Sequence, residues 1–288
     1  MKAHRLAALL ALVCSAAASP VGQMADTVVT LGGIIDREAD DTLAFTPDGR
    51  TVFFDRTAGS RKTIMVSHRV DGRWSMPVAA SFSGRWFDQN PVVAPDGSYL
   101  LFNSDRPVRR GGKSPVQRYF SPAGAPGSNI WRVDRRGSAW GSPVLLDATV
   151  NDDVFVDFPS VAADGTLYYM RFEPLSRTMQ LWRAGLRHGH YGVPARVVLG
   201  DAAVAIHDPA VAPDQSFIVF NYGKVPGGLG RLSIAFASRG GWTQPCDLGD
   251  VENADLPWGA HLSPSGREVS VTGRNGIRSI RLDPWLHE

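Results

Sequence analysis

The chain has 288 residues, of which 43% are hydrophobic and 20% are charged, and its formal net charge is +2 at pH 7. This composition is typical of a globular protein, and so small a net charge argues against nucleic acid or an anionic membrane surface as the main partner. The 30 glycines and 20 prolines indicate many turns and argue against long helices.

The N-terminus has the pattern of an export signal. Lys2 and Arg5 form a positive region, residues 6–13 an apolar region, and residues 16–18 a small-residue cleavage site. We therefore expect residues 1–18 to be a signal peptide and the mature protein to be exported, either to the periplasm or out of the cell.

A lipid-anchored form through Cys14 is the less favoured alternative. The bulky Val13 precedes this cysteine, where lipoprotein signals have a small residue. No later segment has the roughly 18 to 20 uninterrupted apolar residues that a membrane-spanning helix needs. We therefore expect a protein that does not span the membrane.

A short apolar segment, residues 27–33, comes next and is followed by five copies of one hairpin pattern. In each copy a short apolar strand meets a Pro-Asp-Gly-like turn and a second strand follows, because proline and glycine suit the two special backbone positions of such a turn. The copies are LAFTPDGRTVFF (43–54), PVVAPDGSYLLF (91–102), PSVAADGTLYYM (159–170), PAVAPDQSFIVF (209–220) and AHLSPSGREVSV (260–271).

Each of the first four hairpins is followed by a third strand and then by an aromatic-x-x-Pro signal. The signals run from Trp74 to Pro77, from Trp140 to Pro143, from Tyr191 to Pro194 and from Trp242 to Pro245. We expect these aromatic side chains to fill the core between repeats. The second repeat is longer than the others because of an insertion at about residues 107–128.

Four strands per repeat predict an all-β fold, a five-bladed β-propeller of four-stranded antiparallel blades. The fifth repeat ends after its third strand, so the segment at 26–33 is expected to complete that blade and close the ring. A single domain is predicted over residues 26–284. The expected blades are about 41–84, 88–150, 157–204, 208–253, and 257–284 together with 26–33.

The runs PVVAPDGSYLLFNSDRP, NIWRVDRRGSAWGSPVLL and DFPSVAADGTLYY resemble the PD40 (WD40-like) repeats of TolB-type periplasmic and envelope proteins. The resemblance covers nearly the whole expected mature chain and implies a fold rather than a reaction. It also implies binding to envelope partners. Three turns depart from the pattern, with Ala163, Gln215 and Ser265 in place of proline, glycine and aspartate.

Acidic residues precede the innermost strand of each blade, so we expect them around one mouth of the central channel. They lie six to ten positions before the turn residue, and aromatic and histidine side chains accompany them. The candidate ligand-binding residues at this mouth are Asp41, Asp88, Asp157, Asp208, Asp255, Trp86, Trp258, His207 and His261. Each carboxylate has a structural alternative, in which it accepts hydrogen bonds from neighbouring backbone groups.

The loops between second and third strands are expected on the same face, and they are basic. This loop in the second repeat, which includes the insertion, contributes Arg106, Arg109, Arg110 and Lys113 as further candidates, because long loops are usually either functional or disordered. The opposite face is expected to have mostly tight turns. The sequence thus places function on the loop-rich face.

The leading hypothesis is a non-catalytic binding propeller of the bacterial envelope that engages a protein, a peptide or a cell-wall glycan. It would be a monomer or part of an envelope complex. The alternative is a glycan-active enzyme, since glycoside hydrolysis needs two carboxyl groups, here taken from Asp88, Asp157 and Asp208. No metal site is predicted, and no cofactor is expected apart from a possible calcium ion at the channel mouth.

Overall fold

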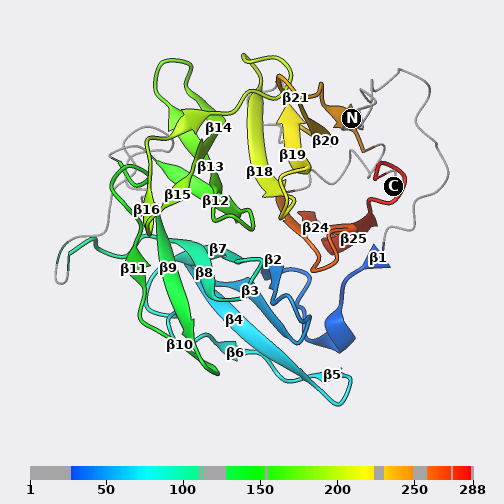
Figure 1. Ribbon diagram of the computed structural model, residues 1–288. Coiled ribbons are helices and arrows are strands. Elements are labelled where there is room, and N and C mark those ends of the chain that lie inside the picture. The colour runs from blue at the N-terminus through cyan, green and yellow to red at the C-terminus, as the bar shows by residue number, and fades with distance from the viewer. Residues whose placement is uncertain are drawn as a thin grey trace, which may run out of the picture.

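A computed structural model describes residues 27–109, 112, 128–152, 155–223, 230–248, 258–273 and 275–286. Five antiparallel sheets are arranged around a common axis, which confirms the predicted five-bladed β-propeller (Figure 1). The signal-peptide prediction, Cys14, Arg110, Lys113 and Asp255 lie outside these residues. Within them, one short 3-10 helix, η1 (Leu31–Gly33), is present, and no helix is long and apolar enough to cross a membrane.

The first two blades have the same order of strands, with the first strand innermost. Blade 1 consists of β2 (Asp40–Phe45), β3 (Thr51–Ala58), β4 (Arg61–Val70), β5 (Arg73–Trp74) and β6 (Val78–Ala79). Blade 2 consists of β7 (Asp88–Val93), β8 (Tyr99–Ser104), β9 (Asn129–Arg136), β10 (Ala139–Trp140) and β11 (Val144–Leu145). In both blades two short outer strands pair with successive parts of the third strand.

The remaining blades vary at their outer edge. Blade 3 consists of β12 (Val156–Val161), β13 (Leu167–Glu173), β14 (Thr178–Ala184) and β17 (Ala195–Arg196), with a small hairpin of β15 (Leu186–Arg187) and β16 (His190–Tyr191). Blade 4 consists of β18 (Ala205–Val211), β19 (Phe217–Gly223), β20 (Arg231–Ser238), β21 (Gly241–Trp242) and β22 (Cys246–Asp247). Blade 5 consists of β23 (Trp258–Leu262), β24 (Glu268–Gly273), β25 (Gly276–Arg281) and β1 (Thr27–Val28).

The hairpin turns keep their geometry where the sequence departs from the repeat. Gln215 replaces the turn glycine and adopts the same left-handed backbone, with φ of 60°. Its side chain accepts a hydrogen bond from the hydroxyl of Tyr168 (2.9 Å) and donates one to Asp164 (3.0 Å), both in blade 3. Ser265 replaces the turn aspartate and accepts the N–H of Arg267 (3.3 Å), as the aspartates do in the other turns. These hydrogen bonds stabilise the two turns in which Gln215 and Ser265 replace the residues of the repeat pattern.

The hydrophobic core is divided into five clusters, each lying between two neighbouring blades. The predicted aromatic signals contribute to them. Trp140 of blade 2 meets Phe53 of blade 1 edge-on at 5.3 Å, and Trp242 of blade 4 meets Tyr168 of blade 3 at 6.4 Å. The expectation that these rings fill the core between repeats is confirmed.

Every inner strand contains a β-bulge near its start, where two residues face one residue of the second strand. The first residue of each bulge has a left-handed backbone; in chain order these are Thr42, Asn90, Phe158, Asp208 and Gly259, with φ between 46° and 66°. Only the fifth is glycine, and a Cβ there would lie 2.7 Å from the methyl group of Thr42 in blade 1. A glycine therefore allows blades 5 and 1 to approach.

The N-terminal and C-terminal segments of the described chain lie side by side in blade 5 (Figure 1). β1 is antiparallel to β25, with Thr27 opposite Ser279 and Val28 opposite Arg278. The backbone N–H of Val29 also donates to Ile277 (2.8 Å). Beyond the strand, Val29 and Leu31 pack against a cluster that contains residues of blades 1 and 5.

Deleting residues 27–33 should lower the unfolding temperature and broaden the transition. The deletion exposes the edge of β25 and removes apolar contacts between the first and last blades. Circular dichroism melting of the mature chain, with and without the segment, measures the effect. Unchanged, equally cooperative melting would show that the ring does not depend on this contact.

Candidate functional site

One mouth of the central channel lies where the five inner strands begin, and the residue just before each bulge is mostly polar. The residues immediately before the five bulges are Asp41, Gln89, Asp157, His207 and Trp258. Four of these five belong to the candidates predicted from the sequence, and Asp208 follows as the bulge residue of blade 4. We call the face that carries this mouth the loop face.

Asp157 is buried in the channel, with 7% of its surface exposed. Its Oδ1 accepts hydrogen bonds from Nδ2 of Asn90 in blade 2 (2.8 Å) and from the N–H of Phe158 (3.0 Å). No hydrogen bond reaches Oδ2 from any described residue. Burial, and to a lesser degree the charge of Asp208, raises the pKa of Asp157 to about 7.

Asp208 repeats this arrangement one blade further on. It is 2% exposed, and its Oδ2 accepts hydrogen bonds from Nδ2 of Asn221 (3.1 Å) and from the N–H of Gly259 in blade 5 (3.0 Å). Its Oδ1 has no hydrogen-bond partner in the described part of the chain. Burial raises the pKa of Asp208 to about 6. The mouth therefore contains two buried carboxyl groups, each with one uncommitted oxygen.

A partly buried ion-pair network supplies the positive charge of the mouth. Nζ of Lys62 lies 2.7 Å from Asp41 and 2.9 Å from Asp55, and Thr42 also hydrogen-bonds to Asp55. Burial raises the pKa of Asp55, and the charge of Asp41 adds to this. Burial alone would lower the pKa of Lys62, but the two carboxylates more than offset it and the pKa is raised. Lys62 is therefore a fixed cation between two acids.

The acidic residues predicted for the mouth do not occupy equivalent positions. Asp88 lies two residues before its bulge and is fully buried. It accepts hydrogen bonds from Arg106 (2.7 Å), Ser104 (2.6 Å) and Ser83 (2.7 Å). Asp40, at the same position in blade 1, pairs with Arg56 at 2.6 Å. Asp88 and Arg106 thus satisfy each other, and the geometry leaves neither of them available to a ligand.

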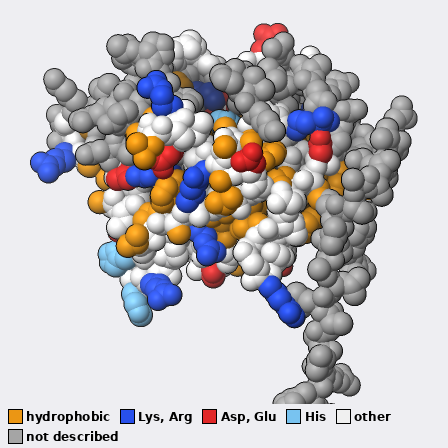
Figure 2. Space-filling model, turned by 90° about the horizontal axis from the view of Figure 1, so that it is seen from above, with side chains coloured by type: hydrophobic (Ala, Val, Ile, Leu, Met, Phe, Trp, Pro, Cys, Tyr) orange, Lys and Arg blue, Asp and Glu red, His pale blue; other side chains and the backbone are white. Residues whose placement is uncertain are grey.

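The other predicted residues are spread over several environments. Trp86 is half-buried before β7 with the guanidinium of Arg85 over its ring (5.2 Å), and Trp258 is half-buried at the start of β23. Burial lowers the pKa of His207, so this imidazole is neutral at pH 7. Arg109 is exposed. On the side seen in Figure 2, acidic and basic side chains lie interspersed among apolar ones, without a region of one sign.

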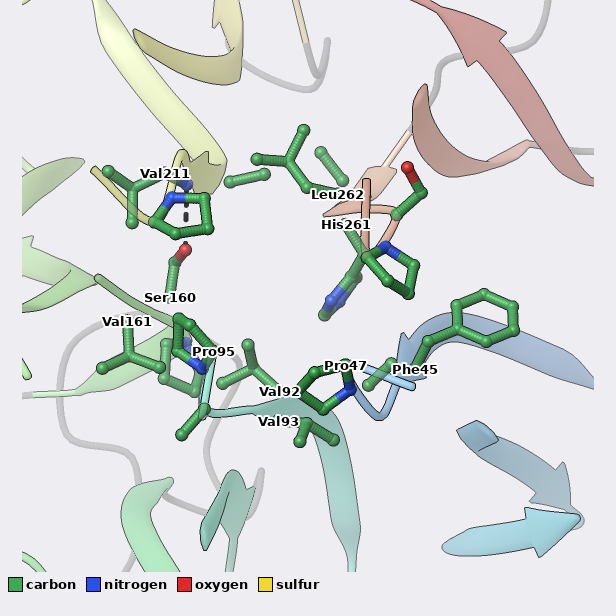
Figure 3. A pocket seen from close by; sticks show the side chains of 18 of the residues that line it. Phe45, Pro47, Val92, Val93, Pro95, Ser160, Val161, Val211, His261 and Leu262 are labelled. Atoms are coloured by element: carbon green, nitrogen blue, oxygen red, sulfur yellow. Dashed lines mark hydrogen bonds between the residues drawn. The ribbon is translucent and has the colours of Figure 1, made fainter. Parts of the chain in front are cut away.

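The opposite end of the channel holds a pocket of about 110 Å³ that the sequence reasoning missed. Six prolines line it, four of them from the hairpin turns, so we call this end the turn face. None of the described lining residues is charged, and the polar ones are His261, Ser160 and Ser263. His261 was predicted as part of the acidic mouth, but it lies two residues beyond the bulge, and Figure 3 shows its ring pointing into the pocket.

The two ends of the channel therefore differ in chemistry. The loop face offers carboxylate oxygens that accept hydrogen bonds or attract a cation, and the turn face offers apolar walls with one imidazole. In the described residues, no group of three or more His, Cys, Asp or Glu side chains is arranged to hold a metal ion.

Replacing Asp157 by Asn should flatten the dependence of stability on pH. An unfolded aspartate has a pKa of about 3.9, so between about pH 4 and 7 the folded state binds more protons than the unfolded state. The stability that this group contributes is fully present below about pH 4 and is lost as the pH rises through about 7. At pH 8 we expect Asp157→Asn to raise the free energy of unfolding by about 1 to 3 kcal/mol.

Urea denaturation at pH 4.5, 6 and 8 measures this dependence. Asp208→Asn should behave in the same way with a midpoint near pH 6, whereas Asp71→Asn, in an exposed turn, should change little. Parallel curves for the parent and Asp157→Asn would contradict a raised pKa at this site.

Comparison with known proteins supports the fold. No model of a known protein family matches the chain, and no curated protein matches it. A protein described as TolB from Agrobacterium tumefaciens has a similar structure, with a TM-score of 0.52 and 16% identity over 87% of this chain and 73% of that one.

A gluconolactonase from Xanthomonas campestris is similar with a TM-score of 0.52 and 15% identity, over 94% of this chain and 80% of that one. TolB from Acinetobacter baumannii gives a TM-score of 0.46 and 17% identity, over 74% of this chain and 45% of that one. The chain thus has the β-propeller fold found in a TolB-type protein and in a gluconolactonase.

Proposed function

We propose that this protein is a non-catalytic binding propeller of the bacterial envelope and that its loop face engages a protein or peptide segment. The segment would present a basic side chain or N–H donors to Asp157 and Asp208. The observation behind this proposal is the pair of buried carboxyl groups at the channel mouth, each with an oxygen that no described residue engages.

The electrostatics of the mouth favour such a ligand. A buried carboxylate without a full set of partners is destabilising, and a ligand cation or N–H donor would supply the missing interaction. Hydrogen bonds to a charged group contribute more than neutral ones, roughly 1.5 to 3 kcal/mol each. The carboxyl groups are held by bonds from neighbouring blades, so their free oxygens are fixed in place before a ligand arrives.

The proposed location rests on the N-terminal sequence. Residues 1–18 have the charge and hydropathy pattern of a signal peptide, and a TolB-type protein shares the fold. We propose that the mature chain is exported to the periplasm or secreted, and that its partner is an envelope component.

Binding of basic peptides to the full mature chain tests the proposed function. Fluorescence anisotropy with a library of short peptides that differ in lysine and arginine content should reveal binding to basic members. The double variant Asp157→Asn, Asp208→Asn should weaken this binding at least about tenfold, since each charge-assisted bond lost contributes about 1.5 kcal/mol or more.

Asp71→Asn is the matched control, because it makes the same change in an exposed turn. A pull-down from envelope extract identifies natural partners. Comparing the proteins captured by the parent and by the triple variant Arg109→Ala, Arg110→Ala, Lys113→Ala tests whether the insertion of the second repeat contacts a partner. Peptide binding that is unchanged in the double variant would show that the channel mouth is not the binding site.

A glycan-active enzyme is the second candidate, and the raised pKa of Asp157 favours it. A carboxyl group with a pKa of about 7 is partly protonated at neutral pH, as a general acid must be. Asp208 would be the second carboxyl of the pair, whereas Asp88 is committed to Arg106.

Turnover of aryl glycosides and oligosaccharides distinguishes the two candidates. An enzyme should release product with a bell-shaped pH profile that Asp157→Asn abolishes. Peptide binding without any turnover across the panel would support the binding propeller.

A further inference from the structure

The turn-face pocket has a regular wall built from the same position of every blade. The residues two positions after the bulges are Ala44, Val92, Ser160, Ala210 and His261. Four of these side chains are small or aliphatic, and only blade 5 contributes an aromatic polar ring. Below them the turn prolines, Pro47, Pro95, Pro213 and Pro264, surround the entrance. The wall is therefore apolar except at His261, Ser160 and Ser263. The hydroxyl of Ser263 already accepts the N–H of Glu268 (3.2 Å) and lies 3.0 Å from the hydroxyl of Ser265.

His261 is buried and its ring is not paired. The residue is 8% exposed, and its imidazole makes no hydrogen bond or ion pair with any residue that the structure describes. Burial lowers its pKa to about 4, so the ring is neutral at pH 7 and presents one N–H donor and one acceptor nitrogen. Leaving such groups without partners is unfavourable by about 1 to 3 kcal/mol. Figure 3 shows the ring directed toward the centre of the pocket.

Ser160 provides a second polar group on the wall. Its Oγ accepts the N–H of Val211 in the neighbouring blade (3.0 Å), shown as the dashed line in Figure 3. The hydroxyl proton has no acceptor among the described residues, so it is available for donation. The pocket thus offers two hydrogen-bonding groups inside an uncharged wall.

We propose that the turn-face pocket is a binding site for a small neutral organic molecule of about one ring, whose hydroxyl or carbonyl group hydrogen-bonds to the imidazole of His261. The apolar part of the molecule contacts the prolines and valines. The volume of about 110 Å³ limits the ligand to at most about one ring, because it is smaller than the roughly 150 Å³ of an apolar protein cavity that accepts benzene. None of the described residues that line the pocket has a charged side chain, which disfavours carboxylates and phosphates as ligands.

This site is separate from the peptide-binding mouth of the loop face. The pocket lining contains neither Asp157 nor Asp208. The proposal therefore does not depend on the proposed function of the loop face, and either can fail without the other.

Phenol is a suitable probe, with toluene and benzoate for comparison. All three carry one aromatic ring, but only phenol is both neutral and able to hydrogen-bond. We expect phenol at millimolar concentration to bind the full mature chain and to shift the imidazole ¹H–¹⁵N signals of His261 in NMR spectra. Toluene should bind more weakly, and benzoate should not bind.

His261→Leu keeps an apolar side chain in the pocket and removes the hydrogen-bonding groups. It should weaken phenol binding about tenfold and leave toluene binding within about twofold, whereas His207→Leu at the other end of the channel should change neither. His261→Gln, which retains a donor and an acceptor, should recover part of the affinity for phenol.

A purely structural histidine would behave differently. Because His261 has no partner in the described structure, His261→Leu should leave the melting temperature of the ligand-free protein unchanged or higher. Phenol binding that is absent, or that is insensitive to His261→Leu, would overturn the proposal. If His261→Leu does not fold, the NMR titration of the parent protein and the His261→Gln variant decide between the same outcomes.

Discussion

The left-handed bulge of each inner strand is the constraint on which the rest of the channel depends. It shifts the register of the strand, so that the residue before the bulge and the residue two positions after the left-handed residue both pair with the second strand. Neighbouring blades are joined at the bulges. Thr42 donates its N–H to Thr272, Asn90 bonds to Asp157, and Gly259 donates to Asp208. The same hydrogen bonds thus link the blades and fix the carboxyl groups of the mouth.

This constraint also explains why similar aspartates have different roles. Asp40 and Asp88 lie two residues before the bulge, where an arginine of the same blade reaches them. Asp157 lies immediately before its bulge and Asp208 is itself the bulge residue. In both, a backbone N–H group and an asparagine satisfy one oxygen and leave the other open. Register relative to the bulge separates Asp40 and Asp88 from Asp157 and Asp208. It does not decide the role alone, because Asp41 lies at the position of Asp157 and is paired with Lys62 of β4. Burial also raises the pKa of Asp157 and of Asp208.

The features that recur in every repeat could be predicted from the sequence. The Pro-Asp-Gly turns, the alternation of apolar residues and the aromatic-x-x-Pro signals each act locally, so the five blades and the aromatic side chains between them could be predicted. The bulges could not, because their left-handed residues are of five different types, and Thr42 and Phe158 are types that rarely adopt this backbone. Without the bulges the acids at 41, 88, 157 and 208 seemed equivalent.

The turn-face pocket was missed for a related reason. The hairpins carry short turns, and short turns suggested a face without a site. The pocket arises from the closed ring, in which five inner strands bring small side chains to one level. The one available signal was His261, which stands where the other repeats have alanine, valine or serine.

Both ends of the channel contain polar atoms without a hydrogen-bond partner, one end among charged groups and the other in an apolar wall. In the blades most polar groups find a partner, and an unpartnered one is unfavourable for folding. At the loop face the unused atoms are carboxylate oxygens near a fixed lysine, which select donors and cations. At the turn face they are the atoms of a neutral imidazole and a hydroxyl in an apolar wall, which select an uncharged ligand. Because only one blade contributes each of these groups, the repeat fold does not require them, and we propose binding as the role that accounts for their placement.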